Sequence, residues 1–132
     1  DYIYQQHVCE CFDHGDTCLG IKRKGEIAAF TWHSLEECRS WHYPVKMREN
    51  EAYLYDMYVL KSFRGHNLAP ILRYKNYEIL KGHGRNTFYS ITERSNVASL
   101  RFKQKLGAKI VFLGLCVVFC NKHGTRWVLK RY

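Results

Sequence analysis

Blocks of apolar and polar residues predict an antiparallel hairpin early in the chain. Residues 17–32, TCLGIKRKGEIAAFTW, contain two apolar runs separated by KRKG. A short polar turn with a glycine between two apolar runs is typical of a β-hairpin, and Gly25 is available for a position of positive φ. We therefore expect two paired strands here.

The middle of the chain predicts a strand followed by a helix. Residues 51–60, EAYLYDMYVL, are rich in Tyr, Leu and Val, and bulky residues on both faces indicate a central strand. Residues 68–81 carry an apolar stripe with helical spacing, and Gly82 and Gly84 provide a stop. The residues of this stripe are Leu68, Ile71, Leu72, Ile79 and Leu80.

The last third predicts a strand, a helix and a second hairpin. After a strand over residues 86–92, Ser95 or Asn96 can cap a helix that Gly107 ends. The inward positions of this helix would be Ser99, Phe102 and Leu106. Residues 108–120 and 125–132 flank the turn NKHG, and residues 110–120 are interpreted as a buried strand. The order of elements predicts an α/β or α+β fold with a mixed sheet, in a single domain over residues 1–132.

Composition favours a globular protein with an anionic partner. The 132 residues are 46% hydrophobic and 15% aromatic, which is enough for a core. The net charge of +9 suits a phosphorylated cofactor, nucleic acid or an acidic substrate. Basic residues are spread along the chain without an RRM-like or helix-turn-helix signature, so nucleic acid is the less favoured partner. No apolar run approaches the roughly 20 residues of a membrane helix, and no secretory signal is recognisable, so we expect a cytoplasmic protein.

The cysteines favour reduced thiols and no metal. Cys9, Cys11, His14 and Cys18 lie close together in the sequence. The Cys-x-Cys spacing is tighter than in most structural zinc sites, and no second pair of ligands follows. We therefore predict that the cysteines act as small hydrophobic residues.

The segment that joins the central strand to its helix has the features of an anion site. In residues 63–72, FRGHNLAPIL, a turn leads into a helix N-terminus, where free backbone N–H groups and the helix dipole converge. Pro70 suits the first helical turn because its missing N–H costs nothing there. Asn67 is among the few residues other than glycine that tolerate a left-handed backbone.

Two motifs give the chain a family resemblance. Residues Arg64 to Ala69 match the pattern of Arg or Gln, two residues, Gly, one residue, then Gly or Ala, with Asn67 in the place of the first Gly. Upstream lies YVLKSFRG, and about 30 residues downstream lies NVASLRFKQKLGAKIV. Over roughly residues 17–132 the chain resembles the GNAT superfamily of acyl-CoA N-acyltransferases. The resemblance implies a GNAT-like fold whose fourth and fifth strands splay apart.

The resemblance also implies a cofactor site for acetyl-CoA or another acyl-CoA. Its diphosphate would lie on the loop that comprises Arg64, Gly65, His66, Asn67, Leu68 and Ala69. Its pantetheine arm would pair with the backbone of Met57, Tyr58 and Val59, and Asn96 would contact the cofactor. The acceptor would be a small-molecule or peptide amine.

Acyl transfer to an amine needs a base and an acid. Asp56 is the first candidate for the base, because a carboxylate within YLYDMYV is costly without a role or a partner, and Glu51 and Glu93 are alternatives. Where many family members have a Tyr acid, this chain has Lys103. Three readings stay open: Lys103 donates the proton, water donates it, or the chain binds acyl-CoA without efficient turnover.

The acceptor side departs from the family. Members of the family usually have a first strand and two helices before the second strand. This chain has instead an atypical N-terminal part of about 16 residues. A trimmed chain, a neighbouring subunit in a homodimer and a reduced fold all stay open. We predict that residues 33–50 form a connection that drapes over the sheet and lines the acceptor site. Aromatic and histidine side chains in and beside it either build a pocket or pack in the ordinary way: Trp32, His33, Trp41, His42 and Tyr43.

Overall fold

The structure, a computed structural model, describes residues 2–39, 45–119 and 123–131. Contacts within the chain divide it into two compact units. The first comprises Asp1–Cys38 and Val45–Ile91, and the second comprises Arg39–Pro44 and Thr92–Tyr132. The prediction of one domain over residues 1–132 stays a prediction.

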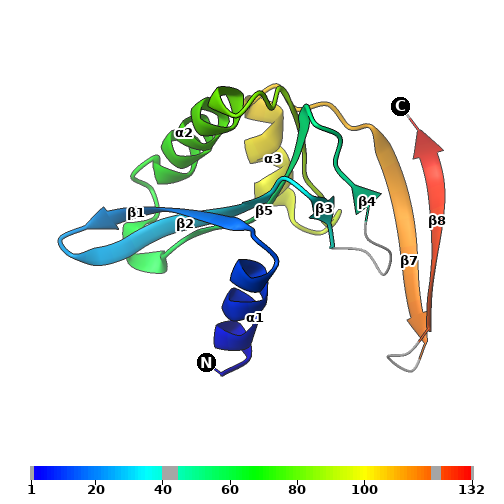
Figure 1. The fold of residues 1–132 in the computed structure, drawn as a ribbon, viewed down its shortest axis with the longest axis horizontal. Helices are drawn as coiled ribbons and strands as arrows, with labels where there is room; N and C mark the ends of the chain where they lie inside the picture. The colour runs from blue at the N-terminus through cyan, green and yellow to red at the C-terminus, as the bar shows by residue number, and fades with distance from the viewer. Residues whose placement is uncertain (1, 40–44, 120–122, 132) are drawn as a thin grey trace. The chain divides into compact units, whose positions relative to one another are not determined.

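A four-stranded mixed sheet forms the body of the first unit (Figure 1). Its order is β1 (Thr17–Arg23), β2 (Glu26–Ser34), β5 (Glu51–Val59) and β6 (Thr87–Tyr89). The first two pairings are antiparallel and β5 pairs with β6 in parallel, so the predicted mixed sheet, the first hairpin and the interior position of β5 are confirmed. Within the predicted connection, β3 (Glu37–Cys38) and β4 (Val45–Lys46) form a short antiparallel pair.

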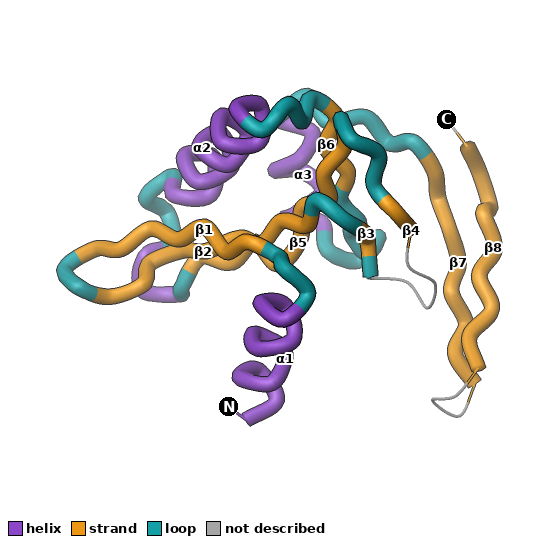
Figure 2. Tube along the Cα trace, in the orientation of Figure 1, coloured by secondary structure: helices purple, strands orange, loops and turns teal. Residues whose placement is uncertain are grey.

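Two helices lie on opposite faces of this sheet (Figure 2). Helix α2 (Leu68–Gly82) follows the short 3-10 helix η1 (Lys61–Phe63) and places Leu68 and Leu72 against Ala28 and Ala29. Helix α1 (Tyr2–Asp13) sets the ring of Phe12 edge-on to that of Trp32, at 5.0 Å between centroids. The predicted helix after the central strand is confirmed, whereas α1 was not expected.

The buried face of α2 differs from the predicted stripe. Ile71 is 52% exposed, while Arg73 and Asn76 are buried. Leu68, Leu72, Asn76 and Leu80 follow one another at four-residue spacing and define the covered face, so Ile71 projects from the far side. The predicted apolar stripe is therefore buried at Leu68, Leu72 and Leu80, but not at Ile71.

The second unit contains α3 (Val97–Lys105) and a hairpin of β7 (Phe112–Phe119) and β8 (His123–Arg131). The predicted cap and stop are confirmed: the N–H of Ser99 donates to Oδ1 of Asn96 at 3.1 Å, and Gly107 has φ +76°. Ser99, Phe102 and Leu106 are partly buried. The second hairpin is confirmed as well, although part of its predicted NKHG turn lies outside the described residues.

The strand predicted within residues 110–120 is present as β7, whereas its burial stays a prediction. Ile110, Val111, Phe112 and Leu115 are each between 41% and 56% exposed. Within the second unit, β7 pairs with β8 from Phe112↔Arg131 to Phe119↔His123.

Candidate functional site

Strand β5 separates from β6 soon after it begins. The two strands pair only from Glu51↔Thr87 to Tyr53↔Tyr89, and β5 then continues to Val59. Past Tyr53 this edge of β5 has no strand partner among the described residues. The splay that the family resemblance implied is confirmed, and it leaves backbone hydrogen-bonding groups for another partner.

A β-bulge interrupts the other edge of β5. Phe30 pairs with Tyr58 but Trp32 pairs with Tyr55, so Asp56 and Met57 together face Thr31. Asp56 takes a left-handed backbone with φ +45°. Since few residues other than Gly, Asn and Asp adopt this conformation readily, the bulge selects the residue type at position 56.

The loop that enters α2 presents a row of backbone donors. Gly65 has φ +83°, and Asn67, the N-cap of α2, has φ +56° and ψ +25°. The left-handed conformation expected for Asn67 is therefore present. The N–H groups of residues 65–69 make no hydrogen bond to any described residue. Since the side chain of Asn67 caps none of them, these donors are available to an anion.

The side chain of Arg64 folds back onto β5, whereas that of His66 contacts the backbone just before it in the chain. Nε of Arg64 donates to the carbonyl oxygen of Val59 at 3.2 Å, and its guanidinium lies 5.6 Å from the ring centroid of Tyr58. Nδ1 of His66 lies 3.2 Å from the carbonyl of Phe63 and 3.1 Å from that of Arg64. Because carbonyl oxygens only accept, Nδ1 carries the proton. The structure thus brings the predicted strand residues and loop residues together.

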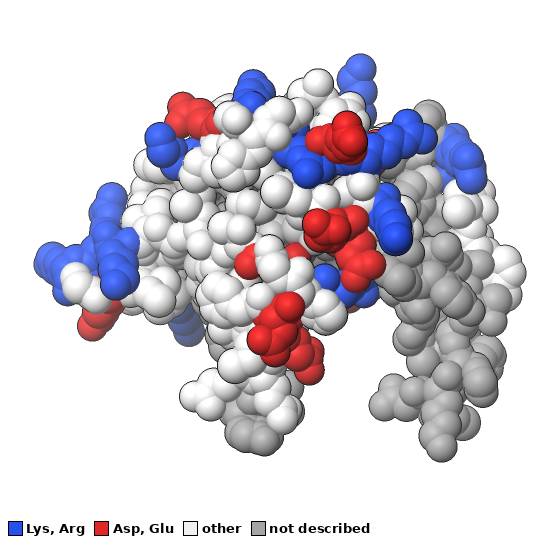
Figure 3. Space-filling model, in the orientation of Figure 1, with Lys and Arg blue, Asp and Glu red and all other residues white. Residues whose placement is uncertain are grey.

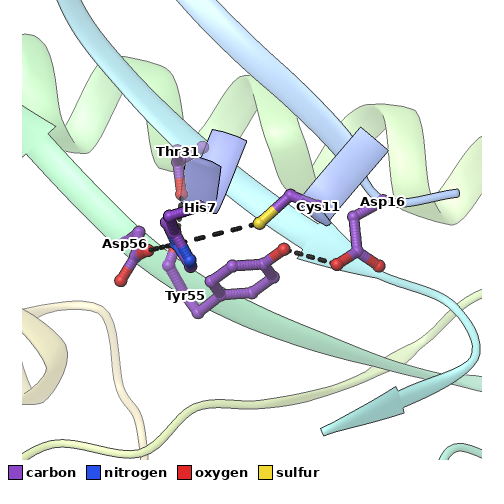
Figure 4. A network of polar contacts seen from close by, with 6 residues as sticks. All are labelled: His7, Cys11, Asp16, Thr31, Tyr55 and Asp56. Carbon is purple, nitrogen blue, oxygen red and sulfur yellow. Dashed lines mark hydrogen bonds and ion pairs between the residues drawn. The ribbon is translucent and has the colours of Figure 1, made fainter. Parts of the chain in front are cut away.

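Asp56 meets a residue that the sequence did not suggest (Figure 4). Its Oδ2 lies 2.8 Å from Nε2 of His7, on α1. The same nitrogen lies 3.7 Å from Sγ of Cys11, one helical turn further on. The side chains of His7 and Asp56 remain 44% and 50% exposed. Asp56 therefore has a partner, and this partner is a histidine rather than an Arg or Lys.

A second contact ties the segment after α1 to β5. The hydroxyl of Tyr55 donates to Oδ2 of Asp16 at 2.5 Å, and Asp16 is buried. Burial, with a smaller contribution from this hydrogen bond, raises the pKa of Tyr55. Tyr55 directly precedes Asp56, so the contact fixes the strand beside the His7–Asp56 pair.

The other acidic candidate of the first unit has a structural setting. Oε2 of Glu51 accepts from the N–H of Arg48 at 3.0 Å, and Oε1 accepts from the hydroxyl of Tyr89 at 3.4 Å. The first bond closes the turn at the start of β5, and the second joins β5 to β6. A base role for Glu51 stays a prediction that its contacts do not favour.

Three predicted site residues belong to the second unit. Glu93 accepts from the hydroxyl of Ser95 at 3.4 Å, Asn96 caps α3, and Nζ of Lys103 donates to Oγ1 of Thr92. Each of these contacts stays within that unit. Their roles in cofactor binding and catalysis stay predictions.

The predicted aromatic pocket divides into buried residues and residues outside the description. Trp32 and His33 are each 2% exposed, and burial lowers the pKa of His33. Both side chains therefore pack in the interior, the alternative that the sequence had left open. Trp41, His42 and Tyr43 lie outside the described residues.

Charged side chains surround the first unit unevenly (Figure 3). Basic side chains gather at the β1–β2 turn, where Lys22, Arg23 and Lys24 follow one another.

Across the described residues, no cluster of three or more His, Cys, Asp or Glu side chains could hold a metal ion. Within the same residues, none of the helices combines the length and the apolar character needed to cross a membrane.

Comparison with known proteins identifies the class. The model of the Acetyltransferase (GNAT) family matches residues 1–108. The chain therefore belongs to the GNAT acetyltransferase family, whose members use acetyl-CoA. No curated protein matches the chain significantly.

Solved structures support the same fold. A transcriptional regulator from Bacillus halodurans C-125 is 18% identical with a TM-score of 0.70, covering 90% of this chain and 77% of that one. AAC(6')-Iy, in complex with the bisubstrate analog CoA-S-monomethyl-acetylneamine, is 19% identical with a TM-score of 0.67, covering 90% and 80%. The ribosomal-protein-S18-alanine N-acetyltransferase from Escherichia coli is 17% identical with a TM-score of 0.55, covering 78% and 55%. At these identities the likeness is one of fold.

Proposed function

We propose that this chain transfers an acetyl group from acetyl-CoA, or the acyl group of another acyl-CoA, to a primary amine by direct attack in a ternary complex. The observation that carries the proposal is the continuity of the open edge of β5 with the donor loop before α2. Acyl-CoA has an extended pantetheine arm followed by a diphosphate, so the arm matches the open strand edge and the diphosphate matches the donor loop.

Binding of the diphosphate is assigned to the loop. Five consecutive residues, Gly65 to Ala69, have backbone N–H groups that no described residue engages, and they extend from the loop into the first turn of α2, at the positive end of the helix dipole. Lys61 and Arg64 add positive charge nearby in the chain. The pantetheine arm would pair with the backbone over Met57, Tyr58 and Val59, past the point where β6 departs.

The bulge on β5 offers the chemistry of the transfer step. A backbone N–H beside the thioester would polarise its carbonyl, an effect worth about 10²-fold in rate or more at comparable oxyanion sites. Asp56 lies in this bulge, and its carboxylate takes part in removing the proton of the amine. The amine nitrogen forms a bond to the carbonyl carbon, the C–S bond breaks, and the departing thiolate takes up a proton.

The acceptor is proposed only as a class. Among the structural neighbours, AAC(6')-Iy is bound to the bisubstrate analog CoA-S-monomethyl-acetylneamine, and the Escherichia coli protein is a ribosomal-protein-S18-alanine N-acetyltransferase. A small-molecule amine and a peptide amine are both consistent with the exposed setting of Asp56.

Calorimetric titration with acetyl-CoA, followed by thiol release with a panel of amines, tests the two halves separately. The panel contains spermidine, tyramine, kanamycin and a peptide with N-terminal alanine. We expect saturable binding and thiol release with at least one amine. Absence of binding refutes the proposal, while binding without thiol release indicates a non-catalytic acyl-CoA-binding module. Salt-sensitive binding of an oligonucleotide that acetyl-CoA does not displace would instead indicate a nucleic-acid-binding domain.

A further inference from the structure

We infer that His7 is the group that accepts the proton of the attacking amine, and that Asp56 is its positioning residue. The inference rests on the proposed function, and it assigns the base to an atom of α1 rather than to the carboxylate on β5. The juxtaposition that carries it joins residues 49 positions apart in the chain, with 2.8 Å between Nε2 and Oδ2.

The backbone on the strand side of this pair is held in place. The bulge puts Asp56 in a left-handed conformation, and Oγ1 of Thr31 donates to the carbonyl of the preceding Tyr55 at 3.3 Å. The hydroxyl of Tyr55 also holds the buried Asp16. Asp56 is thus exposed, while the residue before it, Tyr55, is held by hydrogen bonds at both its carbonyl and its hydroxyl.

The helix side is held equally well. Gly15 ends α1 with φ +77°, and the N–H of Asp16 donates to the carbonyl of Cys11 at 3.0 Å. Cys11 is 4% exposed, and Phe12 packs on Trp32. Because His7 lies one turn before Cys11 on the same helix face, this anchoring directs the imidazole towards β5 (Figure 4).

The contacts select one tautomer of His7. A carboxylate only accepts, so Nε2, at 2.8 Å from Oδ2, carries the proton, and Nδ1 keeps its lone pair. The contact of Nε2 with Sγ of Cys11 is longer, at 3.7 Å, and does not compete for that proton. Nδ1 has no hydrogen-bond partner in the described part of the chain, and the side chain is 44% exposed. Nδ1 of His7 is therefore a basic nitrogen that an incoming amine, or a water bridging to that amine, can approach.

The proton transfer balances without a further reactant. As the amine nitrogen bonds to the thioester carbon, one of its protons passes to Nδ1 of His7, which becomes an imidazolium beside the carboxylate of Asp56. The C–S bond breaks, and the imidazolium gives its proton to the thiolate directly or through water. His7 returns to its neutral form, so the products are the amide and the free thiol.

The decisive variant is His7→Gln, because the glutamine amide can still donate to Asp56 while it offers no basic nitrogen. We expect kcat to fall by about 10² to 10⁴ for the best amine of the panel above, with the Kd of acetyl-CoA unchanged. His14→Gln is the matched control, since His14 is exposed just beyond α1. Its kcat should equal that of the native protein. Added imidazole should restore part of the activity of His7→Ala and none of that of an unrelated defective variant.

A spectroscopic readout keeps the inference testable apart from turnover. In two-bond proton–nitrogen correlation spectra at alkaline pH, we expect His7 to carry its proton on Nε2, and Asp56→Asn to weaken that preference. Native turnover in His7→Gln, failure of imidazole to rescue His7→Ala, or a proton on Nδ1 would each overturn the assignment. Loss of acetyl-CoA binding or of amine-dependent thiol release in the native protein would instead refute the proposed function itself.

Discussion

Replacement of Asn67 by valine or by glycine separates a cofactor loop from an ordinary turn. Asn67 has φ +56° and ψ +25°, a region that costs an ordinary L-residue about 1–2 kcal/mol. A β-branched residue is a genuine outlier there, whereas glycine adopts the conformation without steric cost. The Asn67 side chain makes no cap hydrogen bond, so its loss alone removes little.

The strain in Asn67→Val must be visible in one of two measurements. If the loop keeps its conformation, the free energy of unfolding falls by about 1–2 kcal/mol. If the loop relaxes, binding must restore the left-handed conformation, and the Kd of acetyl-CoA rises roughly 5- to 30-fold. Calorimetry and urea unfolding measure the two quantities, whose losses should sum to the strain. Asn67→Gly should keep the native Kd to within about twofold. Identical values for both variants in both assays would refute the left-handed strain at position 67, and with it the loop geometry on which the diphosphate assignment rests.

Four further substitutions test packing and hydrogen bonds within the two units by urea unfolding. Leu72→Ala should cost about 2–5 kcal/mol because Leu72 is 1% exposed, while Ile71→Ala, at a neighbouring position that is 52% exposed, should cost no more than about 0.5 kcal/mol; equal costs would contradict the packing of α2. Tyr55→Phe should cost about 1–3 kcal/mol because it leaves the buried Asp16 one donor short. Since folding raises the pKa of Tyr55 above its ordinary 10.0, the phenol's contribution is fully present below pH 10.0 and declines above it, so the difference from the native protein should narrow there. Asn96→Ala should cost about 1 kcal/mol through loss of the α3 cap, and an unchanged stability would show that the cap contributes nothing.

Features with a local physical cause could be predicted from the sequence. Gly25 and Asn67 take the positive φ that their turns require, and Asn96 caps the helix that it precedes. Each depends on the intrinsic backbone preference or hydrogen-bonding reach of one residue, so no tertiary information was needed. The splay of β5 from β6 could be predicted only from the family resemblance, because the sequence of residues 51–60 does not indicate where pairing with a neighbouring strand ends.

Helix α1 could not be predicted from the sequence, and His7, the proposed base on this helix, was therefore not recognised. Its sequence, YIYQQHVCECFD, is rich in β-branched, aromatic and cysteine residues that have modest helix propensity, and its first turn has no acidic residue. The helix is instead stabilised by tertiary packing, such as the contact between Phe12 and Trp32. A histidine and a cysteine four residues apart, His7 and Cys11, were the available signal of a shared helix face, but they do not reveal Asp56 as the partner.

The bulge on β5 explains why the base and the open strand edge belong together. A regular strand would continue the alternation of β5 through position 56, and the register of its pairing with β2 would not shift. The additional residue lets Asp56 turn out to meet His7, three positions beyond the last pairing with β6 at Tyr53. The backbone that would hold the pantetheine arm and the carboxylate that orients His7 are consequently parts of one irregular segment. A substitution that removes the bulge should therefore damage cofactor binding and proton transfer together, whereas His7→Gln should damage proton transfer alone.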